Sequence, residues 1–411
     1  MGLPQAEPEQ DVDVPLPRKK VTLEAMKNSA VGLSDRLNTI RIDQYPDTGE
    51  RKLRKFTSGE AAKLIGVDDS YLRQLALEGK GPQVEVLANN RRLYSANDIH
   101  EIRHLLAKTG KAGRKYLKHR SEHEHLQVIS CVNFKGGSAK TTTCAHLAQY
   151  LALHGYRVLA IDLDPQASLT ALHGYQPELD VGANQSLYGT IRYLEEERVN
   201  PADVIRKTYI PGLDLIPAHL ELMEFEHETP KVLVDKKGAH VPFFHRIGVA
   251  LADVADDYDV VLIDCPPQLG FLTLSALSAS TALVITVHPQ MLDLMSMSQF
   301  LNMASELLGA VRDAGGSAEY DWLRYLPTRY DASDKSQESM LTFMREQFGE
   351  DVCKNVMVKS AAISDAGIAK QTIYEPKRDS FSRSTIDRAL EVMNSVNAEI
   401  EEQIMMAWGR I

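Results

Sequence analysis

Five short apolar runs, rich in β-branched residues, alternate with helix-like stretches from Gln127 onward. The runs are VISCVNF, RVLAIDLD, LDLIPA, VVLIDCPP and ALVITV. Strands that are apolar on both faces are typical of a parallel sheet that helices cover on each side. The ligand site of such a sheet lies beyond the carboxyl ends of its strands. The sequence therefore predicts an α/β fold over residues 127–411, with its chemistry in the segments that follow the strands.

The first run leads into the loop FKGGSAKTTT, residues 134–143, and then into the helix-like CAHLAQYLALHG. A strand, a glycine-containing loop and a helix form an anion trap, because loop N–H groups and the helix N-terminus point at phosphates. Each dipole contributes only about 0.3–1 kcal/mol, whereas micromolar binding needs about 8 kcal/mol, so many groups must act together. We predict that the nucleotide is bound by Gly136, Gly137, Ser138, Ala139, Lys140, Thr141 and Thr142.

Two later strand ends add carboxylates. AIDLDPQAS contains Asp162 and Asp164, and VVLIDCPPQLG has the pattern of a Walker B strand that ends in Asp264. Carboxylates this close to a triphosphate would repel it unless they served a metal or the attacking water. We expect Mg²⁺ to be held by Thr141 and, through water, by Asp264. Cys265 has no histidine base among its neighbours, which favours a buried packing role.

The loop departs from the standard G-x-x-x-x-G-K-[ST] pattern, because Phe134 and Ala139 stand where glycines would be. K-G-G-x-x-K-T-T is instead the deviant Walker A motif, which together with D-x-D-P-Q and the Walker B strand resembles the ParA/MinD group of P-loop ATPases. The resemblance implies that Lys140 binds the β and γ phosphates of its own nucleotide. It implies that Lys135 reaches across an ATP-dependent sandwich dimer to the nucleotide of the other subunit.

The same resemblance implies that Asp164 orients the hydrolytic water, while Asp162 is more structural. Lys135 and Asp164 are thus the expected catalytic residues. Ala139 replaces a glycine that is more common in the family, which bears on the hydrolysis rate. The expected cofactors are ATP and Mg²⁺, and the expected enzyme is a weak ATP hydrolase that its partner and DNA stimulate.

Residues 51–110 have the pattern of a winged helix-turn-helix. Thr57 and Glu60 predict a capping box, Gly66 ends the first helix, and Asp68 or Asp69 can cap the second. Val84, Val86 and Leu93, with a turn at Asn89-Asn90, predict a small hairpin, and a further helix begins at Ser95. The module resembles the winged helix of MerR-type regulators. That resemblance implies operator contacts from Ser70, Tyr71, Arg73 and Gln74 to bases, and from Arg91 and Arg92 to the backbone.

Two further sets of cations are candidate DNA contacts. A run without acidic residues follows the winged module and is interpreted as a phosphate-contacting surface: Arg103, Lys108, Lys111, Arg114, Lys115, Lys118 and Arg120. By the family resemblance, nonspecific DNA would be bound in the C-terminal third, for which Lys370, Arg378 and Arg383 are the candidates. Dispersed solubilising charge is the alternative for these and for their neighbours Arg324, Arg329, Lys354, Lys359 and Lys377.

The remaining segments are helical or unpatterned. Residues 1–20 are expected to be a disordered tail. Residues 21–45 carry an a/d stripe, which predicts a helix that dimerises or packs on its own domain: Leu23, Met26, Ala30, Leu33, Leu37 and Ile40. The C-terminal helix, from about Ser384, has a polar face of mostly Glu and Asn, which favours core or dimer packing over a membrane helix. Residues 111–126 would be a basic linker between the winged domain and the ATPase domain at 127–411.

Composition bounds the function that these parts can serve. The net charge of −10 alone argues against nucleic acid, but local clusters outweigh a sum. Four scattered cysteines suggest neither disulfides nor zinc, and no run of about 18 apolar residues predicts a membrane span. A membrane-bound ATPase would need a basic amphipathic tail. A metabolic ATPase with the same loop would need cluster cysteines or a small-molecule pocket.

The whole chain therefore resembles the larger plasmid-partition ATPases, and most closely the RepA group of repABC-type replicons. This implies a cytoplasmic, nucleoid-associated homodimer that segregates plasmids with a ParB-type partner. It also implies autorepression through operator DNA. The alternative is a repressor gated by ATP or ADP that does not coat nonspecific DNA.

Overall fold

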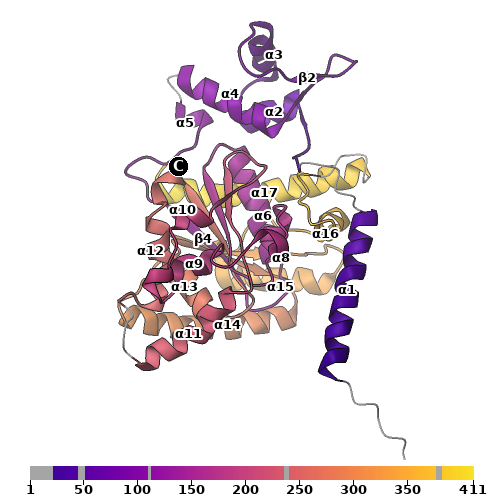
Figure 1. Cartoon of the computed structure of the whole chain (residues 1–411). Coiled ribbons are helices and arrows are strands. Elements are labelled where there is room, and N and C mark those ends of the chain that lie inside the picture. The colour runs from indigo at the N-terminus through magenta and orange to yellow at the C-terminus, as the bar shows by residue number, and fades with distance from the viewer. Residues whose placement is uncertain (1–21, 45–50, 110–112, 236–239, 376–381) are drawn as a thin grey trace, which may run out of the picture. The chain divides into compact units, whose positions relative to one another are not determined.

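The computed structural model describes residues 22–44, 51–109, 113–235, 240–375 and 382–411 (Figure 1). It divides into a unit that ends at Glu50 and a unit from Arg51 to Ile411. The first unit contains α1 (Leu23–Gln44), on which the stripe residues Leu23, Met26 and Leu33 are exposed. The predicted tail at 1–20 and the side chains of Leu37 and Ile40 lie outside the described residues. Dimerisation through α1 stays a prediction.

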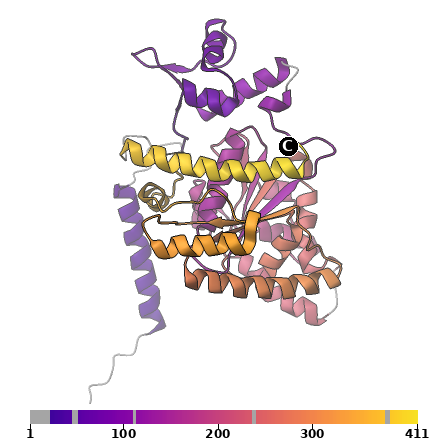
Figure 2. The same ribbon diagram turned by 180° about the vertical axis from the view of Figure 1, so that it is seen from behind.

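The second unit is built on a seven-stranded sheet in the order β10-β9-β4-β8-β5-β7-β6 (Figures 1 and 2). Its strands are β4 (Gln127–Val132), β5 (Val158–Asp162), β6 (Arg206–Lys207), β7 (Leu213–Ile216), β8 (Val260–Asp264), β9 (Ala282–Val287) and β10 (Trp322–Pro327). All neighbours pair in parallel except β6, which runs antiparallel to β7. The five predicted strands are confirmed. The two edge strands were not predicted, because β6 is only two residues long and β10 contains Arg324 and Pro327.

Both faces of the sheet are buried, which explains why its strands lack polar alternation. In β8, Val260 and Leu262 join one apolar cluster, whereas Val261 and Ile263 join the other. The helices that follow β4 along the chain are α6 (Lys140–Leu153), α7 (Ser168–Leu172), α8 (Pro177–Asp180), α9 (Leu187–Ile191), α10 (Pro201–Val204), α11 (Leu222–Asp235), α12 (Arg246–Ala252), α13 (Phe271–Ala279), α14 (Met291–Asp313), α15 (Lys335–Phe348), α16 (Ala361–Ile368) and α17 (Arg383–Ala407). The predicted α/β fold with a mostly parallel sheet is confirmed.

The C-terminal helix α17 packs into the core and contacts α6. Its apolar stripe is buried: Ile386, Leu390, Met393, Val396, Ile400 and Ile404. Beyond the helix, the indole Nε1 of Trp408 donates to the carbonyl oxygen of His125 at 2.8 Å. Core packing of this helix is therefore confirmed. In the described part of the chain, no helix is both long and apolar enough to cross a membrane.

Arg410 fixes the chain end to the segment before β4. Its Nε and Nη2 donate to Glu124 at 2.7 and 2.9 Å, and both side chains are largely buried. This partner lowers the pKa of Glu124 to about 2. We expect Arg410→Ala to reduce the free energy of unfolding by about 2–3 kcal/mol, because it removes two charge-assisted hydrogen bonds from a buried carboxylate that retains the hydrogen bond from the Ser121 N–H. Urea unfolding at pH 7 measures the loss.

The pH dependence of that loss is a check on its cause. A carboxyl whose pKa is depressed on folding stabilises above its ordinary pKa near 4.5, and this contribution fades as the pH falls toward 2. The difference between Arg410→Ala and the wild type should therefore shrink at pH 3. Arg312→Ala is the matched control, because the Arg312–Asp313 pair is mostly exposed and should contribute little. An equal loss in both variants at pH 7 would contradict the assignment.

Residues 51–109 form two helices joined by a tight turn, followed by a small sheet and a longer helix. They are α2 (Ser58–Ile65), α3 (Asp69–Leu77) and α4 (Ala96–Thr109), with the strand order β1 (Phe56–Thr57), β3 (Arg92–Tyr94), β2 (Glu85–Val86). The capping box of Thr57 and Glu60 is confirmed, as is Gly66 at the end of α2 with φ +82°. The predicted hairpin is confirmed too, since β2 and β3 pair antiparallel. The strand β1, which pairs with β3, was not predicted.

The predicted cap of α3 is wrong in its chemistry. Asp68 stands at the N-cap position, but its side chain accepts no capping hydrogen bond. Asp69 cannot replace it, because its carboxylate is engaged with the Ser58 hydroxyl and with Arg73. The sequence has two successive carboxylates here, and its pattern does not show which of them bonds Ser58 and Arg73 instead of capping the helix.

The interpretation of the basic run as a DNA-contacting surface is wrong for three of its members. Arg103 is 2% exposed, and its guanidinium donates to the carbonyls of Leu64, Tyr116 and Leu153. Lys118 pairs with buried Glu401, and Arg120 donates to the carbonyls of Glu124, Ala255 and Tyr258. These cations attach the segment after the winged module, including α5 (Gly113–Tyr116), to the sheet domain. Lys111 and the side chain of Arg114 lie outside the described residues.

Candidate functional site

The loop between β4 and α6 has the backbone of an anion-binding turn. Gly137 and Ala139 adopt left-handed conformations, with φ of +78° and +69°. A residue with a Cβ costs about 1 kcal/mol in this region, which is the physical reason that glycine is common where Ala139 stands. The first turn of α6 has neither a side-chain cap nor an acidic residue. Its N–H groups and the positive end of the helix dipole thus suit a negatively charged ligand.

The carboxyl ends of β4 and β9 hold the loop in place. The Asn133 carboxamide accepts from the backbone N–H of Lys135 at 2.8 Å and donates to the carbonyl of Thr286. The Thr286 hydroxyl donates to the Ser138 hydroxyl at 3.0 Å. Sequence reasoning missed Asn133 and Thr286. Their signal was available, because both lie at the ends of strands that were predicted.

The two lysines of the loop have different surroundings. Lys140 is buried, its Nζ lies 3.4 Å from the carbonyl oxygen of Lys135, and burial lowers its pKa. The side chain of Lys135 is half exposed, and its Nζ lies 2.7 Å from the buried carboxylate of Asp293, at the start of α14. Lys140 is thus fixed within the loop, whereas an ion pair outside the loop holds Lys135. Asp293 was not predicted, because nothing in the sequence links it to residue 135.

The strand register brings two of the three predicted carboxylates together. Asp162 of β5 lies opposite Asp264 of β8. One oxygen of Asp162 accepts from the N–H and the hydroxyl of Thr170, both at 2.7 Å, and burial raises the pKa of Asp162 to about 7. These contacts give Asp162 a structural role in shaping the segment that contains Asp164. Asp164 is half buried, and its Oδ1 accepts from the N–H of Gln166 at 3.0 Å.

Asp264 is the least satisfied polar group at this edge. It is fully buried, and neither of its oxygens accepts a hydrogen bond within the described residues. Burial raises its pKa, although the nearby Thr141 hydroxyl and Lys140 ammonium favour the charged form. Such a carboxylate is costly unless a cation or a bound water completes it. The arrangement fits Mg²⁺ beside Thr141.

That fit needs few protein ligands. Among the residues that the structure describes, no group of three or more His, Cys, Asp or Glu side chains could hold a metal ion. Mg²⁺ commonly takes one or two protein ligands and completes its shell with water and substrate phosphates. The four cysteines, Cys265 among them, are free and buried, so the packing role of Cys265 is confirmed.

The structure leaves most of the candidate DNA contacts exposed. Ser70, Tyr71, Arg73 and Gln74 are exposed on α3, and Arg91 is exposed in the hairpin loop, whereas Arg92 is partly covered. Lys370 is exposed after α16. Arg378 and the side chain of Arg383 lie outside the described residues.

Two of the other C-terminal cations have partners inside the fold. Arg324 donates to Gln403 and to Asp351. Arg329 donates to the carbonyl of Gly137 at 3.1 Å, which places its guanidinium at the rim of the loop. Neither is a freely dispersed charge. Arg329 was missed as a site residue because the strand that precedes it, β10, was not predicted.

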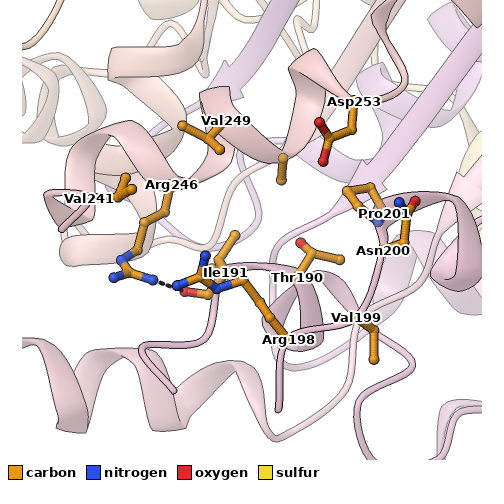
Figure 3. A pocket seen from close by; sticks show the side chains of 11 residues that line it. Thr190, Ile191, Arg198, Val199, Asn200, Pro201, Val241, Arg246, Val249 and Asp253 are labelled. Atoms are coloured by element: carbon orange, nitrogen blue, oxygen red, sulfur yellow. Dashed lines mark hydrogen bonds between the residues drawn. The ribbon is translucent and has the colours of Figure 1, made fainter. Parts of the chain in front are cut away.

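A separate pocket of about 250 Å³ lies between α9, the segment before α10, and α12 (Figure 3). Arg198 and Arg246 approach each other at one end of it, and Arg246 donates to the carbonyl of Ile191 at 3.0 Å. No residue of the β4–α6 loop and none of the three carboxylates lines this pocket. It is therefore distinct from the candidate site.

The strand, loop and helix, with acidic residues at the ends of two further parallel strands, define a P-loop nucleotide-binding protein. The sequence profile of an AAA domain matches residues 126–313. A protein of Rhizobium rhizogenes described as a replication protein A is 54% identical over 94% of this chain and 95% of its own length. The chromosome partitioning protein ParA of Caulobacter vibrioides is 29% identical over 66% of this chain and 94% of its own length.

A solved structure of a partition protein has a TM-score of 0.59 with 22% identity, and covers 90% of this chain and 98% of its own. At that identity it supports the fold alone. Together with the curated relatives, these similarities show that the chain belongs to the family of ParA-type partition ATPases.

Proposed function

We propose that the chain binds ATP and Mg²⁺ at the β4–α6 loop and hydrolyses ATP slowly as part of DNA partition. The observation that carries this proposal is a combination of three features. The first turn of α6 has no capping side chain, the side chain of Lys135 is half exposed, and Asp264 accepts no hydrogen bond within the described residues. In the ATP state, two chains would form a sandwich dimer that binds nonspecific DNA. A ParB-type partner would stimulate hydrolysis and thereby drive plasmid segregation.

Each site residue has a chemical role in this proposal. Lys140 and the N–H groups of residues 136–142 bind the phosphates, with the buried position of Lys140 limiting competition from water. Thr141 and Asp264 would hold Mg²⁺, which screens the phosphate charge when it is bound. Asp164 orients the water that attacks the γ-phosphate, while Asp162 fixes the backbone beside it through Thr170.

Lys135 would change partners on dimerisation. Its Nζ is committed to Asp293 in the single chain, so it can reach the nucleotide of a second subunit only after that ion pair opens. An added phosphate charge favours the exchange, because Asp293 carries one negative charge and the triphosphate carries several. ATP binding and dimerisation are then coupled by one side chain.

This coupling gives a test. Lys135→Ala should bind ATP within a few-fold of the wild-type affinity but should stay monomeric in saturating ATP-Mg²⁺, because the contact across the dimer is lost. Multi-angle light scattering with ATP and with ADP measures the dimer. Lys354→Ala, which removes an exposed lysine, is the matched control and should dimerise normally. A dimer of wild-type stability in Lys135→Ala would contradict the proposed role.

A second activity is favoured by the exposed α3 residues. We propose that Ser70, Tyr71, Arg73 and Gln74 contact operator bases, with Arg91 and Arg92 near the backbone, so that the chain represses its own operon. Support comes from the guanidinium of Arg103, which joins the carbonyl of Leu64 in α2 to that of Leu153 at the end of α6. Because α6 begins at the nucleotide loop, operator binding and nucleotide binding would be linked, and linkage is reciprocal.

Operator binding also allows an alternative to the partition function. A repressor gated by ATP or ADP would use the same α3 contacts and the same nucleotide loop but would not coat nonspecific DNA. The two functions differ in one observable property, which is binding to DNA of random sequence.

A further inference from the structure

The segment that follows β10 touches the nucleotide loop at two successive residues. The hydroxyl of buried Thr328 donates to the carbonyl of Ser138 at 2.9 Å. Nη1 of Arg329 donates to the carbonyl of Gly137 at 3.1 Å. Arg329 itself adopts a left-handed conformation with φ +53°, which is unfavourable for a residue that has a Cβ. Strained backbone of this kind persists where the surroundings hold it, and it clusters at functional sites.

These two contacts determine which way the loop N–H groups point. In a trans peptide, the C=O and the following N–H lie in one plane and point in opposite directions. By holding the carbonyl of Gly137, Arg329 directs the N–H of Ser138 away from itself. By holding the carbonyl of Ser138, Thr328 does the same for the N–H of Ala139. The orientation of each of two successive N–H groups is thus set from outside the loop.

An anion-binding nest needs this kind of order. Nests form where successive N–H groups converge, with residues in the left-handed region between them, as Gly137 and Ala139 are. In an unsupported loop, peptide planes can rotate, and each rotation removes a donor from the phosphate. An Arg held at the carbonyl side lowers that freedom before the ligand arrives. The exposed guanidinium also adds a positive charge at the rim of the site.

We propose that Arg329 is a positioning residue for the nucleotide, acting through the Gly137–Ser138 peptide. This inference rests on the proposed ATP binding at the same loop. Arg329, which the sequence analysis had grouped with candidate DNA contacts, is thereby assigned to the nucleotide site. This role also accounts for an alanine at position 139, since a loop held from outside depends less on glycine to reach its conformation.

The test is the dissociation of a fluorescent ATP analogue carrying a methylanthraniloyl group. Arg329→Ala should bind it about tenfold more weakly, mainly through faster dissociation, because one oriented donor is lost. The nucleotide-free protein should unfold at the same urea concentration as the wild type, because the Arg329 side chain is exposed. Arg329→Lys should recover only part of the affinity, since lysine restores the charge but not the planar guanidinium.

Arg345→Ala is the matched control. Arg345 is also exposed and donates to a backbone carbonyl, that of Lys354 at 3.3 Å, which is outside the loop. Equal dissociation rates in Arg329→Ala, Arg345→Ala and the wild type would overturn the positioning role. Full recovery by Arg329→Lys would also overturn it, because charge alone would then explain the effect.

A Lys140→Ala arm separates the inference from the function on which it rests. If Lys140→Ala still binds the analogue tightly, the proposed nucleotide site is wrong and the Arg329 role falls with it. If Lys140→Ala loses binding while Arg329→Ala keeps the wild-type rate, the nucleotide site stands and only the positioning role fails.

Discussion

Replacing Lys140 with alanine is expected to weaken ATP binding by about a hundredfold, which corresponds to roughly 3 kcal/mol. Lys140 is the cation buried within the loop, and a charge-assisted contact to phosphate is strong where water is excluded. The free protein should lose little stability. Burial lowers the pKa of Lys140 and so disfavours its charged form. Removal of the ammonium therefore also removes the free-energy cost of burying that charge.

Isothermal titration calorimetry with ATP-Mg²⁺ measures the loss, and urea unfolding without nucleotide measures the stability. Lys231→Ala, which removes an exposed lysine on α11, is the matched control and should leave both quantities unchanged. Retention of wild-type affinity by Lys140→Ala would show that the β4–α6 loop does not bind the triphosphate.

Replacing Asp164 with alanine is expected to lower the turnover number for ATP hydrolysis by about a hundredfold or more, since a positioned carboxylate contributes roughly 10²–10⁴ to such a step. ATP binding should stay within a few-fold of the wild type, because the hydrogen bond that the Asp164 side chain accepts comes from the N–H of Gln166 and not from the β4–α6 loop. Trapped in the ATP state, the protein should accumulate as dimers. Phosphate release and light scattering measure the two effects.

Asp162→Asn is the informative comparison for this variant. Asp162 is buried and accepts two hydrogen bonds from Thr170, so its replacement should lower the free energy of unfolding by about 1–3 kcal/mol. Asp164→Ala should unfold like the wild type. An unchanged turnover in Asp164→Ala would overturn the assignment of Asp164 as the residue that orients the water.

The parts of the fold that were predictable are those that local pattern determines. The interior strands read as apolar runs because both faces are buried, and the nucleotide loop has a distinctive spacing of glycines and lysines. The capping box at Thr57 and the αL turn at Gly66 depend on residues within one helix, so they could also be predicted. The edge strands β6 and β10 were not predicted, because an edge strand pairs with a neighbour on one side only and its sequence is less constrained.

The contacts that could not be predicted join residues far apart in the chain. Asp293 meets Lys135 and Arg329 meets Gly137 only because β9 lies beside β4 in the sheet and β10 lies beside β9. The basic run shows the reverse case. A row of cations without acids looks solvent-facing, yet Arg103, Lys118 and Arg120 find carbonyls and carboxylates on other elements. Charge pattern does not reveal partners that tertiary structure supplies.

Fluorescence anisotropy of a labelled random-sequence duplex tests the partition function most directly. The duplex is titrated with the protein at one fixed salt concentration in ATP-Mg²⁺, in ADP-Mg²⁺ and without nucleotide, because phosphate-driven binding depends steeply on salt. An ATP-dependent dimer that coats nonspecific DNA predicts strong binding with ATP-Mg²⁺ and weak binding in the other two states. Equal binding, or none, in all three states would contradict the partition function and would favour a nucleotide-gated repressor.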